Sequence, residues 1–268
     1  MSSAVTEALG DSRVVMRRNL IKIVRVPEIL VFTLIQPIMF VLLFAYVFGS
    51  AIDLKGTDYR EFLIAGIFAQ TTLFGATFTG FSLAEDMQKG VIDRFRSLPM
   101  SRVAVLLGRT FSDVVINGLS ILVMAIAGLV VGWRIHTSVG EALAGFALLL
   151  FFAFAFSWVM AWVGLVVPGP EVVQQASFLV IFPLTFIANT FVPLENLPGV
   201  LKGFAEWNPV SAVTQASRDL FGNGAGVARM SHAWPIDHAV LYTFAWGLVI
   251  LALFVPLSVR QYQRAALR

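Results

Sequence analysis

The sequence contains no cysteine and only three histidines. Without cysteine, the chain forms no disulfide and holds no thiolate-bound metal ion. His136, His232 and His238 are scattered without the spacing of metal ligands, which favours surface roles for all three. No G-x-x-x-x-G-K-[ST] phosphate loop, G-x-S-x-G turn or paired His/Asp constellation occurs either. The sequence therefore predicts no metal, no cofactor and no catalytic site in this chain.

Charged residues are also scarce. They make up 13% of the chain, about half the share of a typical soluble domain, whereas hydrophobic residues make up 58%. An uncharged run of about 18 or more apolar residues is typical of a membrane-spanning helix. We expect one all-α polytopic membrane domain over residues 1–268 with six transmembrane helices. The predicted spans are 29–48, 62–83, 103–131, 142–167, 172–192 and 238–258.

The positions of lysine and arginine predict the orientation of these spans. An even number of spans places both termini on one side of the membrane, and that side carries 13 of the 19 basic residues. Basic residues are enriched in cytoplasmic loops, so both termini are expected in the cytoplasm. The basic residues on the opposite side are Lys55, Arg60, Arg134, Lys202, Arg218 and Arg229.

Residues 9–27 are expected to form a helix that lies in the inner membrane interface. At 100° per residue, apolar and basic side chains fall on opposite faces, and the cations suit anionic headgroups. Pro27 marks the end of this helix. The alternative is a basic flank that only fixes topology. The apolar face comprises Met16, Leu20, Ile23 and Val24, and the basic face comprises Arg18, Lys22 and Arg25.

The connector 84–102, which includes EDMQKGVIDRFRSLPMSR, concentrates charge between two apolar runs. Its apolar residues bunch on a short predicted helix that stops at Pro99. A bulky phenylalanine among charges favours a surface for a protein partner over a solvated loop, which stays the alternative. Basic residues interleaved with acids and without stacking aromatics do not predict nucleic-acid binding. The candidate partner residues are Val91, Ile92, Arg94, Phe95 and Arg96.

The connection 193–236 on the outer side is too long for an unstructured loop and is rich in apolar residues. Asn208 is a suitable N-cap, Pro209 fits the first helical position, and Gly222 fits the helix stop. We expect two short helices that enter the outer leaflet as a re-entrant segment, which is tolerated where protein buries it. The alternative is a surface lid without membrane contact.

Polar residues inside predicted spans are costly and require an explanation. Arg109, Asp113 and Asn117 recur every four residues and share one helix face. Arg109 and Asp113 can form a structural ion pair, which lowers the free-energy cost of inserting the third span into the bilayer. The alternative is a hinge whose ion pair breaks and forms during function.

Further polar residues fall within the first, second and fifth spans. Gln36 precedes Pro37, which predicts a kink in the first span. The second span has a small polar face that suits close helix packing or a translocation path, formed by Gln70, Thr71 and Thr72 with Gly75. Asn189, near the outer end of the fifth span, has the same two interpretations, close helix packing or a translocation path.

Three stretches of the chain resemble the membrane subunit of ABC-2 type exporters, in particular its daunorubicin-resistance branch in actinobacteria. They are RRNLIKIVRVPEILVFTLIQPIMFVLLFAYVFG, KGVIDRFRSLPMSRVAVLLGR and FVPLENLPGVLKGFAEWNPVSAVTQASRDL. The resemblance covers nearly the whole chain in order. It implies a six-span permease of a bacterial plasma membrane that exports a drug-like molecule or lipid.

The same resemblance implies the partners of the chain. These are a second permease copy and two separate ATPase subunits that bind ATP and magnesium, with membrane lipids around them. The connector 84–102 corresponds to the coupling helix that sits in a cleft of the ATPase. The rival function is a stand-alone secondary transporter or channel, which needs a coupling-ion site, and Asp113 is the one candidate acid within a span.

Overall fold

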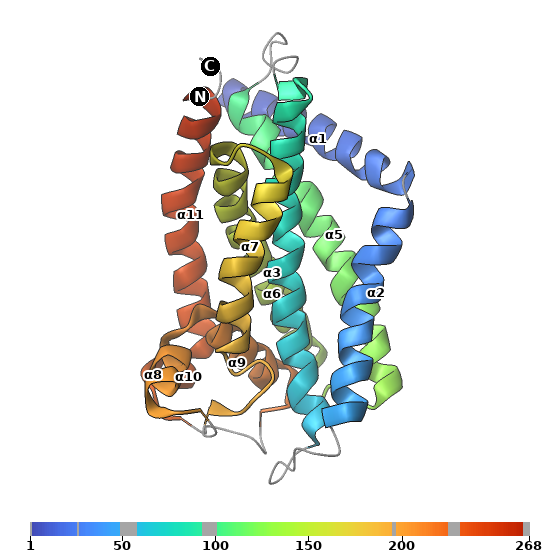
Figure 1. The fold of residues 1–268 in the computed structure, drawn as a ribbon, viewed down its shortest axis with the longest axis vertical. Helices are drawn as coiled ribbons and strands as arrows, with labels where there is room; N and C mark the ends of the chain where they lie inside the picture. Colours follow the sequence, from blue (N-terminus) through green and yellow to red (C-terminus); the bar gives the residue numbers. More distant parts are fainter. Residues whose placement is uncertain are drawn as a thin grey trace.

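The computed structural model describes residues 2–25, 27–48, 58–92, 101–194, 197–224 and 231–264, and all regular structure in these ranges is helical. Long helices run side by side along the longest axis (Figure 1). The elements are α1 (Ser2–Arg25), α2 (Pro27–Leu43), the π-helix η1 (Phe44–Phe48), α3 (Tyr59–Gln88), α5 (Arg102–Val131), α6 (Val139–Val166), α7 (Pro170–Phe186), α8 (Gly199–Trp207), α9 (Pro209–Phe221), α10 (Trp234–Asp237) and α11 (Ala239–Arg264).

The two ends of the helix bundle differ. The start of α1 and the end of α11 lie at the same end, which we call the terminal end, and α1 crosses it obliquely (Figure 1). The short helices α8, α9 and α10 gather at the opposite end. The prediction of both termini on one side and of the 193–236 connection on the other is consistent with this arrangement.

Four predicted spans are confirmed as helices long and apolar enough to cross a membrane. These helices are α3, α5, α6 and α11, each of 26 residues or more. At about 1.5 Å per residue, each exceeds the roughly 30 Å thickness of a hydrocarbon core. The chain is thus an all-α membrane protein.

The first predicted span is helical throughout, because the 17-residue α2 continues directly into η1. The fifth predicted span is a shorter helix than expected, since α7 has only 17 residues. α7 ends at Phe186, although the apolar run continues toward residue 192. The backbone beyond α7 bonds to α9 instead, because the N–H of Asn189 donates to Ser211 Oγ at 3.2 Å.

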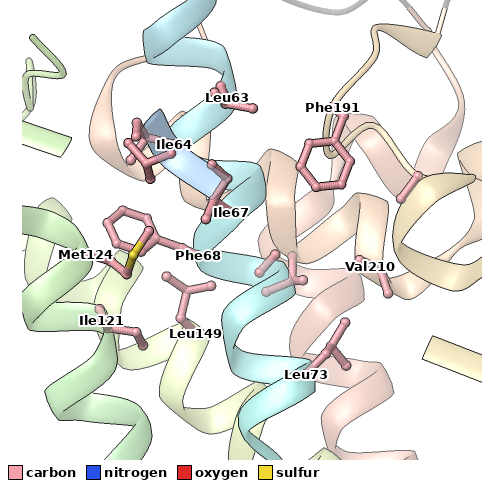
Figure 2. Packing of buried hydrophobic residues seen from close by; sticks show 14 of the residues in the cluster. Leu63, Ile64, Ile67, Phe68, Leu73, Ile121, Met124, Leu149, Phe191 and Val210 are labelled. Atoms are coloured by element: carbon pink, nitrogen blue, oxygen red, sulfur yellow. The ribbon is translucent and has the colours of Figure 1, made fainter. Parts of the chain in front are cut away.

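The central helix is α3, which contacts α2, α5, α6, α7 and α9. Phe68 on α3 is fully buried and meets Trp133, Phe146 and Phe221 edge-to-face at 5.5–5.9 Å between ring centroids. Such edge-to-face pairs add to the energy of burial. Figure 2 shows side chains of α3, α5 and α6 meeting at this centre, among them Leu63, Ile64, Ile67, Phe68, Ile121, Met124 and Leu149.

The backbones of α3 and α6 approach each other through two glycines. A Cβ atom on Gly164 would lie 2.2 Å from the carbonyl oxygen of Gly80, and one on Gly80 would lie 2.5 Å from that of Met160. Small residues permit this approach, and close packing drives helix association where lipid provides no hydrophobic force.

The helix signals in the connection 193–236 are confirmed. The side chain of Asn208 accepts a hydrogen bond from the N–H of Val210, Pro209 opens α9, and Gly222 ends it in the left-handed region at φ 77°. α9 is buried on nearly all sides, whereas α8 leaves Val200 exposed. The N-terminal helix is also confirmed. It begins earlier than expected, at Ser2, and α2 starts at Pro27.

Candidate functional site

The structure describes two of the five candidate partner residues in the connector. Val91 and Ile92 are helical, and Ile92 is only 4% exposed, packing with Leu83, Val105 and Leu106 of the same chain. Its contacts are therefore internal, and a partner surface would have to use its neighbours. Arg94, Phe95 and Arg96 lie outside the described residues.

Helix α1 is attached to the segment that precedes the connector. Lys22 Nζ lies 3.1 Å from Glu85 Oε2, and a guanidinium nitrogen of Arg18 lies 3.6 Å from Asp86 Oδ2. Glu85 also accepts a hydrogen bond from Lys89, just beyond α3, and this bond raises the pKa of Lys89. Arg18 and Lys22, expected to face lipid headgroups, thus pair with α3.

Helix α1 is also attached to the segment that follows the connector. The backbone N–H of Ser101 donates to Asp11 Oδ2 at 3.1 Å, and Asn19 Nδ2 donates to Ser112 Oγ at 3.3 Å. A Cβ atom on Gly108 would lie 2.5 Å from the carbonyl oxygen of Ser12, so α1 and α5 touch at backbone distance. One helix therefore holds both ends of the connector.

The polar stripe of the third span forms a buried cluster. Arg109 Nε lies 3.8 Å from Asp113 Oδ2, and both residues are less than a tenth exposed. Thr79 of α3 donates a short hydrogen bond to the same carboxylate oxygen, and Asn117 Nδ2 donates to the backbone oxygen of Asp113 at 3.0 Å. Of these residues, sequence reasoning missed Thr79, because its partner lies on another helix.

Gln36, Gln70 and Thr71 lie together in one cavity of about 620 Å³, although they come from different helices. This central groove is bounded by α2, α3, α5 and α7. Its volume falls within the range of about 300–1,000 Å³ usual for ligand sites. It mixes amide and hydroxyl groups with aromatic rings. The lining includes Glu28, Gln36, Phe40, Gln70, Thr71, Phe74, Phe78, Ser120, Gln174, Ser177 and Phe178.

A continuous run of phenylalanine rings borders the central groove. It begins on α2, passes through Phe191 beyond α7, follows α7 and returns to α3, with successive centroids 4.1–6.4 Å apart. The groove residue Glu28 lies at the start of α2, near the terminal end, whereas Phe44 and Phe191 belong to the opposite half. The run consists of Phe40, Phe44, Phe191, Phe186, Phe182, Phe178 and Phe74.

Asn189 lies in a second polar cluster, built around Arg218 of α9. Arg218 is 1% exposed, and its guanidinium donates to the carbonyl oxygens of Asn189 at 2.6 Å, Thr190 at 3.4 Å and Phe62 at 3.0 Å. It also lies over the Phe62 ring, 3.6 Å from the centroid. The sequence suggested only an outer basic residue here, because backbone acceptors leave no sequence signal.

Within the described ranges, no group of three or more His, Asp or Glu side chains could hold a metal ion. His136 instead pairs with Glu61 at 2.8 Å, and His238 stacks on Trp234 at 5.1 Å between ring centroids. These contacts are those of ordinary surface histidines.

The helical architecture and the polar groove between apolar helices define a multi-pass membrane protein. The profile of the ABC-2 type transporter family matches residues 11–221, and the chain belongs to this family. It is similar to the daunorubicin resistance ABC transporter permease protein DrrB1 of Streptomyces coeruleorubidus, with 33% identity over 237 residues, 88% of this chain and 80% of the relative.

Two more distant relatives are also transport permeases. The probable doxorubicin resistance ABC transporter permease protein DrrC of Mycobacterium tuberculosis is 24% identical over 242 residues, 87% of this chain and 81% of that protein. The probable multidrug ABC transporter permease YbhR of Escherichia coli K12 is 20% identical over 203 residues, 74% of this chain and 53% of that protein. The chain is thus an ABC-2 transporter permease, a transport component rather than an enzyme.

Proposed function

We propose that this chain is the membrane subunit of an ATP-driven exporter, in which a separate ATPase subunit binds ATP and magnesium. Family membership and the drug-resistance permeases among its relatives support this assignment. The sequence contains no phosphate loop, and the proposal accordingly assigns ATP binding to a separate subunit. The exporter contains two permease copies and two ATPase subunits in the plasma membrane.

The proposal includes six spans with both termini in the cytoplasm. α2 and η1 together run from residue 27 to residue 48, which at about 1.5 Å per residue suffices to cross a core of roughly 30 Å. α7 is shorter, and α9 meets its end from the outer side. Because α9 is buried and Arg218 satisfies the carbonyls there, a re-entrant path for α8–α10 is tolerable in a bilayer.

The central groove is the observation that carries the proposal. Polar side chains inside a membrane are expensive and mark substrate paths. Here Gln36, Gln70 and Thr71 share a cavity with Phe40 and Phe178, so it offers hydrogen bonds and aromatic surface together. This combination suits an amphipathic or hydrophobic cargo better than a sugar or an ion.

A second permease copy would complete the groove. The helices beside it leave large apolar side chains exposed, including Met39 on α2 and Phe178 and Leu179 on α7, each more than half exposed. In the proposed dimer these faces meet around the substrate path. The stacked rings of Phe44 and Phe191 lie beyond the groove toward the opposite end, whereas Glu28 lines it near the terminal end, so in this proposal cargo enters from the terminal, cytoplasmic side.

The connector would transmit the work of the ATPase. α1 holds the connector on both sides, through Glu85 and Asp86 before it and Ser101 after it, and leads directly into α2 at Pro27. A displacement of the connector would therefore move α1 and, through it, the wall of the groove formed by α2. In this proposal the connector is the coupling element, and Phe95 anchors it in the ATPase.

The test is transport of a fluorescent amphipathic dye into vesicles that contain the permease and its ATPase. The variant Gln70→Leu with Thr71→Val removes the polarity of the groove at nearly constant volume, and we expect transport to fall at least tenfold while protein abundance stays normal. The matched control is Thr72→Val, since Thr72 is buried on α3, does not line the groove and bonds to its own helix at Ala69. Equal transport by both variants would exclude the groove as the path.

The same vesicles separate the rival functions. ATP-dependent uptake that stops without the ATPase supports the exporter, whereas uptake driven by an ion gradient in the permease alone supports a secondary transporter, and passive equilibration supports a channel. In the complete system, Phe95→Ala should leave the permease in the membrane but uncouple ATP hydrolysis from uptake. Normal assembly and uptake in this variant would favour the solvated-loop alternative for the connector.

A further inference from the structure

Three arginines on the outward face of α1 have no acidic partner among the described residues. Arg13, Arg17 and Arg25 are exposed, and no ion pair joins them to another residue in the described ranges. The two other cations of this helix that the structure describes pair with α3. The basic residues of α1 thus form two groups: one pairs with acidic residues of α3, and the other faces outward.

The outward arginines alternate with apolar side chains. Arg13 and Arg17 are one helical turn apart, about 6 Å along the axis. Val14 on the same side is 65% exposed and Ile21 is 40% exposed. An open groove of about 460 Å³ follows this face, lined by Arg13, Met16, Arg17, Leu20, Ile21 and Arg25.

We propose that this groove binds an anionic phospholipid of the leaflet at the terminal end. The phosphate lies against the guanidiniums of Arg13 and Arg17, whose fork geometry suits phosphate oxygens. An acyl chain covers Leu20 and Ile21. Neutralised phosphates and covered apolar side chains together explain a face that mixes both kinds of residue, as in other interfacial helices.

The position of α1 favours a lipid over an acidic protein surface. Arg25 is the last residue of α1, and α2 starts at Pro27, so Arg25 lies beside the start of the first span, at headgroup height. α1 crosses the terminal end of the bundle, where α2 enters it (Figure 1). A soluble acidic partner would neutralise the arginines and leave Ile21 and Val14 at the lipid boundary unexplained.

Native mass spectrometry of the purified full chain tests the site by counting retained phospholipids. Phosphatidylglycerol and phosphatidylcholine with identical acyl chains are titrated separately, so that only the headgroup differs. The wild-type chain should retain phosphatidylglycerol preferentially. Each neutralised arginine should weaken this binding about fivefold, as expected for one basic residue near an anionic surface. The variant combines Arg13→Gln, Arg17→Gln and Arg25→Gln.

Matched controls separate the site from general charge. Arg260→Gln with Arg264→Gln removes two exposed arginines at the same end of the molecule, on α11, and should retain the wild-type preference. Lysines in place of the three α1 arginines should retain most of it, because lysine also binds phosphate. Millimolar inorganic phosphate should not displace the lipid, because it lacks the acyl chain.

Three results would overturn the proposal. They are equal binding of both lipids by the wild-type chain, an unchanged preference in the triple variant, and loss of the co-purifying ATPase from that variant with its lipid retained. The last result would assign the arginines to an acidic protein surface. If the triple variant does not fold, Arg17→Gln alone must still show the fivefold loss.

Discussion

At the scale of single residues, the carboxylate of Asp113 has two partners from different helices. Arg109 precedes it by one turn on α5, and Thr79 donates from α3. Removing one partner of a buried charge leaves the other uncompensated, which usually costs more than the pair contributes. The Arg109–Asp113 contact thus fits a structural ion pair, while the hinge stays an alternative that a variant series can separate.

We expect Arg109→Ala to lower the abundance of folded permease, because an unpaired carboxylate in a bilayer costs at least about 2.5 kcal/mol. Arg109→Ala with Asp113→Ala should recover part of that loss. Thr79→Val is the milder control, since Asp113 keeps its cation and loses one hydrogen bond. Abundance and transport are measured in each variant.

The hinge alternative predicts another pattern. The double variant would then reach normal abundance and yet fail to transport, since the switch itself would be absent. Wild-type behaviour of Arg109→Ala in both measurements would mean that the two charges do not interact functionally or structurally.

At the scale of elements, α9 is joined to α3 and to the turn after α7 by one side chain. Arg218 donates to the carbonyl of Phe62 in α3 and to those of Asn189 and Thr190, which lie beyond the end of α7. A buried carbonyl without a donor costs about 1–3 kcal/mol. Hydrogen bonds from Arg218 to backbone therefore join α9 to the spans, in addition to the burial of Val210, Val213 and Phe221 in the core.

Arg218→Met keeps the length of the side chain but removes every donor, so we expect a loss of about 3 kcal/mol or more. That loss corresponds to an apparent Tm roughly 6–12 °C lower for a protein of this size, measured in detergent. Arg218→Lys should rescue little, because an ammonium cannot reproduce the fork.

Arg134 provides the matched control for Arg218. It also donates to backbone carbonyls, those of Leu129 and Trp133, but it is exposed. Arg134→Met should change the free energy of unfolding by no more than about 0.5 kcal/mol. Equal effects of the two substitutions would mean that the burial of Arg218 does not increase its contribution to the free energy of unfolding.

At the scale of the whole molecule, the two ends of the bundle have separate tasks in the proposed mechanism. The terminal end holds α1, the end of α3 and the start of α5, with most of the basic residues in the described ranges, and the other end holds α8–α10 (Figure 1). In the proposed topology, the excess of basic residues places the terminal end in the cytoplasm.

Single cysteines test this orientation against a clean background, since the natural chain has none. Cysteines in place of Ser3 and Ala266 should resist an impermeant thiol reagent in intact cells, whereas one in place of Gly56 should react. After the cells are opened, all three should label. Labelling of both termini in intact cells would reverse the orientation and remove the coupling role of the connector.

The sequence alone determined the features that depend on short stretches of chain. Uncharged runs located four spans, Asn208 and Gly222 located α9, and Pro27 located the break between α1 and α2. The spacing of Arg109 and Asp113 sufficed to pair them, because residues four apart meet on any α-helix. Each of these signals is local, so no knowledge of packing was needed.

Only the tertiary structure decided which distant residues meet. Gln36 and Gln70 line one groove because α2 and α3 pack together with α7 beside them. The sequence around either residue does not predict that the other lies nearby. Arg218 reaches the carbonyl of Phe62 across 156 residues of sequence. Every residue carries a backbone carbonyl, so the residue types at positions 62 and 218 do not predict this contact. The length of α7 was likewise set by hydrogen bonds from another helix rather than by its own apolar run.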